Sequence, residues 1–293
     1  MPSYKGAITL AGLMRAAFRE FQKNDPLRIA AATAFFTTFA LPAIVIILIQ
    51  IFGLIAGRRA IGQQLFTGLT DILGPNAVEE MRATLRNVRQ LAQAWYIAAG
   101  VFLFLIFVST TLFKVIRDTL NQLWDIRLKD STGFLFQLRQ RGRSFLIILL
   151  AGMLFLTVLL AEGLLTLLPE KADLLNRLLK QIISVIAATA WFTLVFKYIS
   201  DGYTNWRTTL AGAFFTGLLF TIGKMILGVL LSYSTIKNIY ATSTSFVLLL
   251  LFVFYCSFMF YYGACFLKVW ASHKQHPITP HRHAIRYKLS MVD

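Results

Sequence analysis

The segment Ile29–Gly57 is 29 residues long and carries no charged side chain. About 20 apolar residues are enough for a helix to cross the hydrocarbon core of a membrane, so this segment alone is long enough to span one. The whole chain agrees, because 57% of its 293 residues are hydrophobic and only 14% are charged. A soluble chain carries roughly a quarter charged residues to solvate its surface. The sequence therefore predicts an all-α, polytopic integral membrane protein.

Six segments are long enough, or nearly so, to cross a membrane. The first exceeds a straight crossing, because at about 1.5 Å per residue it would reach roughly 40 Å, against a hydrocarbon core of about 30 Å. A kink at Pro42, a broken helix, a tilt or a re-entrant hairpin would absorb the excess. The six segments are residues 29–57, 94–113, 145–168, 182–200, 210–232 and 246–267.

The basic residues of the loops favour six crossings over seven. With six crossings, 18 Lys and Arg residues lie on the side of the two termini and nine on the opposite side. Loops rich in Lys and Arg stay in the cytoplasm, so we expect both termini there. The predicted organisation is a cytoplasmic segment 1–28, a six-helix transmembrane domain 29–270 and a basic, histidine-containing cytoplasmic tail 271–293.

Two segments outside the spans have the apolar spacing of an amphipathic helix. In residues 1–28 the apolar positions are mixed with basic ones, which predicts a helix on the membrane surface. In the external segment 57–93, the apolar residues Val78, Met81 and Leu85 recur every three or four positions, with arginines between them. That helix either lies on the outer headgroups or caps a cavity between the spans.

Three ionisable side chains fall inside the predicted spans, where each is costly unless it is paired or hydrated. Glu162 comes late in the third span, so it either lines an external vestibule or reaches the outer headgroups. Lys197 comes late in the fourth span, where its long stem can extend to the interface. Lys224 lies about two-thirds along the fifth span, too deep to reach water easily. Lys224 is therefore the strongest candidate for a binding site.

Three further residues complete the candidate set. Pro42 gives the first span a point at which it can bend. Asn121 and Trp124 end the second helical region within a polar cluster; a tryptophan suits a membrane interface, but an anchor does not explain the whole cluster. The candidate substrate-binding residues are Lys224, Glu162, Pro42, Asn121 and Trp124.

The sequence contains no recognisable catalytic motif, which argues against an enzyme. Cys256 and Cys265 are nine residues apart and lie on opposite faces of a helix, so we expect no disulfide or two-thiol metal site. The tail holds all four histidines, divided by prolines, and a solvated basic tail is favoured over a zinc site. We expect no cofactor and no metal. The histidines are His273, His276, His281 and His283.

Three stretches of the chain resemble the YihY/BrkB family of bacterial inner-membrane proteins. They are the alanine- and aromatic-rich run IAAATAFFTTFALP (residues 29–42), the element LNQLW (residues 120–124), and the C-terminal half from Trp206 into the sixth span. Lys224 matches a basic position of the family's fifth span. The chain departs from the family at Cys265, where the family has glutamate after Gly-Ala, and at Ala241, where the family has glycine in a Tyr-Gly-Ser loop.

The resemblance implies six transmembrane helices in a bacterial inner membrane, without an established substrate. The family's former ribonuclease label is regarded as mistaken, and this chain lacks the metal ligands that a nuclease needs. Some members are linked to virulence or serum resistance. One branch is linked to lipid A and to lipid traffic in the envelope.

Two functions are therefore expected. The first is a transporter of a lipid or another amphiphilic anion of the envelope, without its own ATPase; the alternative is a non-transporting scaffold for envelope-assembly proteins. The expected partners are membrane lipids, whose anionic headgroups fit the basic cytoplasmic loops. Nucleic acid is not expected despite a net charge of +16. Two kinds of protein partner are left as alternatives: further copies of this chain and envelope-assembly proteins.

Overall fold

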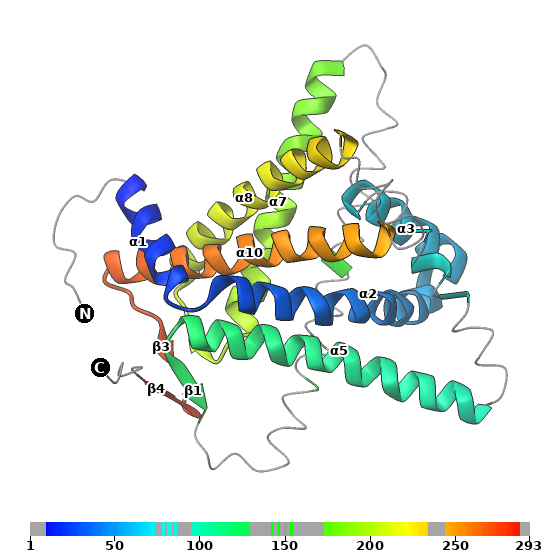
Figure 1. Ribbon diagram of the computed structural model, residues 1–293, viewed down its shortest axis with the longest axis horizontal. Helices are drawn as coiled ribbons and strands as arrows, with labels where there is room; N and C mark the ends of the chain where they lie inside the picture. The colour runs from blue at the N-terminus through cyan, green and yellow to red at the C-terminus, as the bar shows by residue number, and fades with distance from the viewer. Residues whose placement is uncertain are drawn as a thin grey trace.

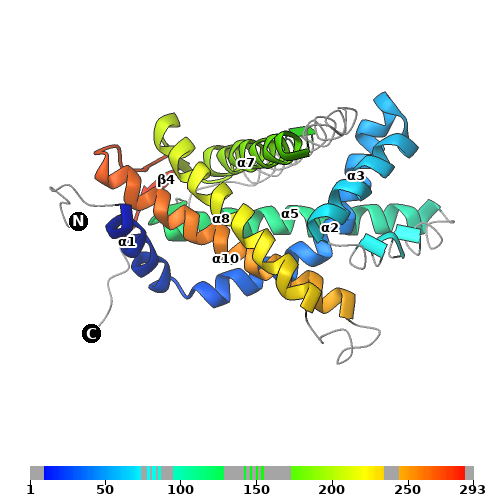
Figure 2. The ribbon, with the colours of Figure 1, turned by 90° about the horizontal axis from the view of Figure 1, so that it is seen from above.

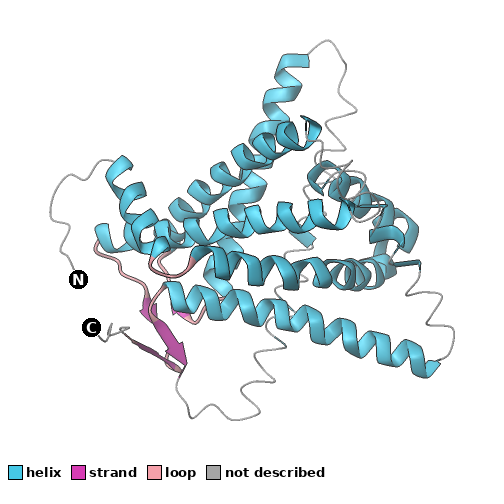
Figure 3. Cartoon of the chain, viewed as in Figure 1, coloured by secondary structure: helices cyan, strands magenta, loops and turns pink. Residues whose placement is uncertain are grey.

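The computed structural model describes residues 10–73, 78–79, 81–83, 85–86, 95–128, 142, 146, 150, 153–154, 173–233 and 244–287. Helices dominate this part of the chain, with four very short strands at one end (Figures 1 and 3). The helices are α1 (Leu10–Gln22), α2 (Pro26–Ala56), α3 (Arg58–Leu73), α5 (Trp95–Leu123), α7 (Asp173–Tyr198), α8 (Trp206–Tyr233) and α10 (Thr244–His273). The strands are β1 (Ile126–Leu128), β2 (Gly202–Tyr203), β3 (Thr279–Pro280) and β4 (Ala284–Arg286).

Helix α10 is the centre of the bundle. It packs against α1, α2, α5 and α8, whereas α7 packs mainly on α8 and α3 mainly on α2. Seen from above, α8 and α10 run diagonally past α5, with α7 beyond them (Figure 2). The described part of the protein is therefore built as helices around one long apolar helix, α10; the composition predicted the helices but not this arrangement.

The name strand end is used for the end of the bundle at which α5 and α10 finish. Here β1 pairs antiparallel with β4, Ile126 lying opposite Arg286, and β2 pairs with β3, Gly202 lying opposite Pro280. Helix α1 and strand β4 lie at this same end (Figure 1). The described elements nearest the two termini therefore lie at one end of the bundle, while the number of crossings stays a prediction.

Three helices in the described part of the chain are long and apolar enough to cross a membrane: Pro26–Leu54, Gln181–Tyr198 and Leu249–His273. They coincide with the first, fourth and sixth predicted spans. The second and fifth predicted spans are helical, within α5 and α8. Most of the third, 145–168, lies outside the described residues. Six crossings and cytoplasmic termini stay predictions.

The first span is one continuous helix, α2, with Pro42 inside it. A broken helix and a re-entrant hairpin, both left open by the sequence, do not occur here. Proline lacks an N–H and cannot donate to the carbonyl four residues before it, in this case that of Thr38. The helix nevertheless continues to Ala56, and Gly57 then ends it with a positive φ of 86°, a conformation that favours glycine.

The described apolar residues of the external amphipathic segment, Val78, Met81 and Leu85, pack against protein. Val78 and Met81 are both 3% exposed, and they pack with Val45 of α2 and Leu69 of α3. The basic side remains outside, where Arg86 forms an ion pair of 2.9 Å with Glu79. The periodicity therefore predicted the buried face of this segment correctly. The partners of that face are α2 and α3.

The tail is attached to the bundle. Ile278 and Ala284 are 3% and 6% exposed and join the main core. The backbone N–H of His281 donates to the carbonyl of Asp201 at 2.9 Å. No group of three or more histidine, cysteine or acidic side chains suited to a metal occurs among the described residues. Strand pairing with β1 and β2 is what holds this segment, and its histidine spacing gave no sign of it.

Candidate functional site

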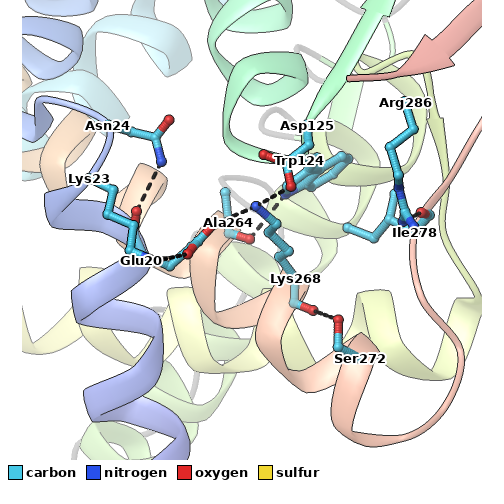
Figure 4. Close-up of polar contacts among 10 residues, drawn as sticks. All are labelled: Glu20, Lys23, Asn24, Trp124, Asp125, Ala264, Lys268, Ser272, Ile278 and Arg286. Carbon is cyan, nitrogen blue, oxygen red and sulfur yellow. Dashed lines mark hydrogen bonds and ion pairs between the residues drawn. The ribbon is translucent and has the colours of Figure 1, made fainter. Parts of the chain in front are cut away.

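Lys268 lies between two carboxylates at the strand end (Figure 4). Its Nζ is 2.6 Å from Glu20 of α1 and 2.9 Å from Asp125, which follows α5. The Lys268 side chain is 15% exposed and that of Glu20 is 24% exposed. One lysine thus joins three helices, and two carboxylates balance its buried charge.

The Glu20 carboxyl has a pKa below its ordinary value. Burial alone would raise this pKa, because it disfavours the charged form, but the hydrogen bond and charge of Lys268 and the nearby Lys23 lower it by more. Lys23 is 3.5 Å away, and its side chain is 70% exposed. Glu20 is therefore held as a carboxylate by Lys268.

Helix α1 is held against α10 by more than this ion pair. Leu13 and Ala17 are buried against Phe266 of α10. The hydroxyl of Tyr262 donates to the backbone carbonyl of Met14 at 3.1 Å. One face of the amphipathic helix α1 therefore packs on α10. The sequence predicted a helix on the membrane surface and did not predict this contact.

Asn121 binds a buried aspartate. Nδ2 of Asn121 donates to Oδ2 of Asp201 at 2.8 Å, and the backbone N–H of Asp201 donates to Oδ1 of Asn121 at 2.9 Å. Nε of Arg117 is 3.7 Å from the same carboxylate. Asn121 and Asp201 are each 5% exposed. This pair ties the end of α5 to the connection between α7 and α8.

Trp124 lies in the core rather than at an exposed interface. It is 1% exposed, and its Nε1 donates to the backbone carbonyl of Ala264 at 3.1 Å. Its ring packs at 6.3 Å from that of Phe196 of α7. Burial and a hydrogen bond to α10 therefore satisfy both parts of the indole within the protein.

The residues that do have the character of interfacial anchors surround Lys197. Its Nζ donates to the carbonyl of Thr204 and lies over the rings of Tyr203 and Trp206, at 4.6 and 5.3 Å from their centroids. Both aromatic side chains are more than half exposed. The ammonium group extends from the last turn of α7 to polar and aromatic partners; its place at a membrane interface stays a prediction.

Lys224 lies on the side of α8 that faces α7. Phe220, one turn earlier, contacts Phe192 of α7 with ring centroids 5.8 Å apart, and Gly217, two turns earlier, lies against Thr189 of α7. Residues spaced by three or four share one helix face, so Lys224 continues this row. Its side chain is half-buried. Among the residues that the structure describes, it makes no hydrogen bond or ion pair.

The four candidate residues that the structure describes do not form one site. Asn121 and Trp124 lie together at the strand end, Lys224 lies in the other half of α8, and Pro42 is half-buried in the middle of α2. Glu162 lies outside the described residues. Binding of a substrate by these residues stays a prediction.

The sequence interpretation missed the ion pairs of Lys268 with Glu20 and Asp125. Lys268 directly follows the sixth predicted span, which marks it as a residue near the interface. Glu20 is 248 positions away in the chain, and nothing local in the sequence connects the two. Asp201 was missed for the same reason, because its partner Asn121 is 80 positions away.

Comparison with known proteins agrees with this architecture. The chain is 25% identical over 263 residues to a UPF0761 membrane protein of Teredinibacter turnerae, which covers 87% of this chain and 59% of the relative. The chain thus spans about three fifths of that relative's length. No solved structure matches the chain. The family model described as virulence factor BrkB matches residues 17–286, and the chain therefore belongs to the BrkB family of membrane proteins.

Proposed function

We propose that this protein moves a lipid or another amphiphilic anion across a bacterial inner membrane, without an ATPase of its own. The observation that carries the proposal is Lys224, a half-buried cation that makes no polar contact within the described part of the chain. An ionisable group inside a predicted membrane span is expected to face protein or a hydrated path. An anionic headgroup passing beside α8 would supply the missing counter-charge.

The exposed surface of the α7–α8 hairpin, in the half that contains Lys224, suits the apolar part of such a molecule. Ile222 and Ile226, on the same helix, are 54% and 56% exposed, and Ile182 and Ile186 of the adjacent α7 are 54% and 62% exposed. These four side chains make the exposed sides of both helices of the hairpin apolar. Ile222 and Ile226 are two positions from Lys224 and therefore lie on the other face of α8. A molecule with a charged head and an apolar tail would place its head at Lys224 and its tail along the exposed isoleucines.

The other end of the bundle is closed by direct contacts. The Lys268 ion pairs, the Asn121–Asp201 pair and the two small sheets join α1, α5, α7 and α10 there. Any rearrangement that admits a substrate is therefore expected in the half of the hairpin that contains Lys224. Pro42 leaves one backbone hydrogen bond of α2 unmade, which gives that helix a point at which it can bend.

The test is lipid movement in liposomes that contain the purified protein. Fluorescent anionic and zwitterionic lipids are compared for the wild type, Lys224→Met and Lys114→Met, the last removing an exposed lysine of α5. The proposal expects wild type and Lys114→Met to move anionic lipid and Lys224→Met to lose at least tenfold in rate, the effect of about 1.4 kcal/mol.

Two results would contradict the proposal. Movement that is unchanged in folded Lys224→Met would exclude Lys224 as the binding cation. No movement of any lipid by the wild type would reject lipid transport and favour the scaffold, whose partners would then be sought by crosslinking. A further variant, Glu162→Gln, tests whether that carboxylate lines the path of the substrate: if it does, the rate of lipid movement by Glu162→Gln differs from that of the wild type.

A further inference from the structure

Helix α1 has an exposed face besides the buried face that packs on α10. Leu13, Ala17 and Phe21 are at most 2% exposed and form the face against α10. On the neighbouring face Phe18 is 42% exposed, although its ring lies 6.0 Å from that of Tyr262. Helix α1 therefore carries apolar side chains on more of its surface than its protein contacts cover.

The exposed apolar residues of α1 adjoin the apolar outer surface of the bundle. Helix α2 begins four residues after α1, and Leu27, Phe35 and Phe39 form an exposed row along it, at 64%, 54% and 49%. Phe215 of α8, which contacts Tyr262, lies next to the exposed Phe214. In both figures α1 lies beside the start of α2 (Figures 1 and 2). Phe18 and Leu27 thus continue a surface whose composition suits lipid chains.

Basic side chains accompany this surface. Arg15 and Arg19 are exposed on α1 and make no ion pair with any residue that the structure describes. Lys23 and Arg28 have side chains 70% and 67% exposed, and each contacts one acidic group within three residues. The exposed side of α1 and the start of α2 is therefore strongly basic. An apolar edge next to free guanidinium groups matches the boundary between lipid chains and anionic headgroups.

We infer that α1 binds the surface of an anionic phospholipid leaflet, with Phe18 and Leu27 among the outermost chain segments and Arg15 and Arg19 on lipid phosphates. The occupant follows from charge complementarity and from continuity with the apolar surface of α2 and α8. The Glu20–Lys268 ion pair fixes α1 to α10, so the helix presents these groups in one orientation. This binding is independent of whether Lys224 moves a substrate.

The test measures hydrogen exchange of the α1 amides in the full-length protein. The protein is placed in nanodiscs of phosphatidylcholine alone and of phosphatidylcholine with phosphatidylglycerol. Each basic residue near an anionic surface contributes about a fivefold effect, so phosphatidylglycerol should slow exchange in α1 by about tenfold or more. The double variant Arg15→Gln/Arg19→Gln should lose most of this difference, and high salt should reduce it in the wild type.

Two matched variants separate charge from folding. Arg15→Lys/Arg19→Lys keeps the charges and should retain the difference between the two lipids. Arg58→Gln/Arg59→Gln removes two exposed charges at the opposite end of α2 and should leave α1 unaffected. Equal exchange of α1 in both lipids for the wild type, or an unchanged difference in the folded Arg15→Gln/Arg19→Gln variant, would overturn the inference.

Discussion

The two halves of the α7–α8 hairpin are packed very differently. In the half near the strand end, Phe196 of α7 and Ala213 of α8 are fully buried, in one core with α5 and α10. In the other half, Ile186 of α7 and Ile226 of α8 are 62% and 56% exposed. Both halves contain polar residues that stand out in the sequence. Among the residues that the structure describes, those of the buried half have partners, whereas Lys224 in the other half has none.

This difference separates structural polar residues from the candidate binding residue. Asn121 has a buried aspartate and Trp124 a backbone carbonyl as partners, so both are accounted for by the packing of the strand end. Lys224 lacks such a partner among the described residues. Burying a polar group without a partner destabilises the folded state. Such a group is kept in a protein where a function requires it. Variants of the two halves should therefore affect different properties.

The largest loss of stability is expected from Trp124→Ala. Removal of a fully buried indole and its hydrogen bond to Ala264 should lower the free energy of unfolding by about 3–5 kcal/mol. The matched variant Trp206→Ala removes an indole that is 51% exposed and should cost clearly less. Thermal unfolding in detergent checks both. Equal losses would mean that the strand end is no more tightly packed than its surface.

A second prediction concerns the contact between α8 and α10. A Cβ added at Gly212 would lie 2.7 Å from Cβ of Leu267, closer than packed carbon atoms approach. Gly212→Ala should therefore destabilise the protein by about 1–3 kcal/mol. Gly62→Ala, where the nearest atom is 3.8 Å away, is the control and should be neutral or slightly stabilising. A neutral Gly212→Ala would show that α8 can shift on α10.

A pH effect of intermediate size is expected from Glu20. Its pKa is lowered in the folded protein from an ordinary value of 4.5, so its contribution is fully present above that pH and is lost as the pH falls through the folded pKa. For a partly exposed pair the contribution is about 1 kcal/mol. The melting temperature of wild type should thus fall more steeply below pH 4.5 than that of Glu20→Gln. Parallel curves would contradict the role of the Lys268 ion pair.

The smallest effect on stability is expected from Lys224→Met. Lys224 is half-buried and has no polar partner among the described residues, so replacing it with an apolar side chain of similar length leaves none of those residues newly unpaired. The melting temperature should stay the same or rise slightly, within about 0.5 kcal/mol of wild type. The same variant should lose lipid movement. A large loss of stability would instead place Lys224 among the structural residues, beside Asn121.

Much of the fold could be predicted from the sequence, because the signals are local. Apolar composition and length identified the segments that form α2, α5, α7, α8 and α10, and the spacing of Val78 and Met81 identified their buried face. Helix ends were less accurate: α5 continues to Leu123, ten residues beyond the predicted span, because a helix can leave the membrane without ending. Six crossings and their orientation stay predictions from length and charge.

The sequence by itself determined that this chain is a helical membrane protein and that Lys224 is an unusual cation within an apolar helix. Only the tertiary structure decided which polar residues are paired. Glu20, Asp125 and Lys268 meet because α1, α5 and α10 end at one place, and Asn121 meets Asp201 for the same reason. The physical reason is that hydrophobicity is a property of each segment, whereas the free energy of a buried charge depends on partners that lie far apart in the chain.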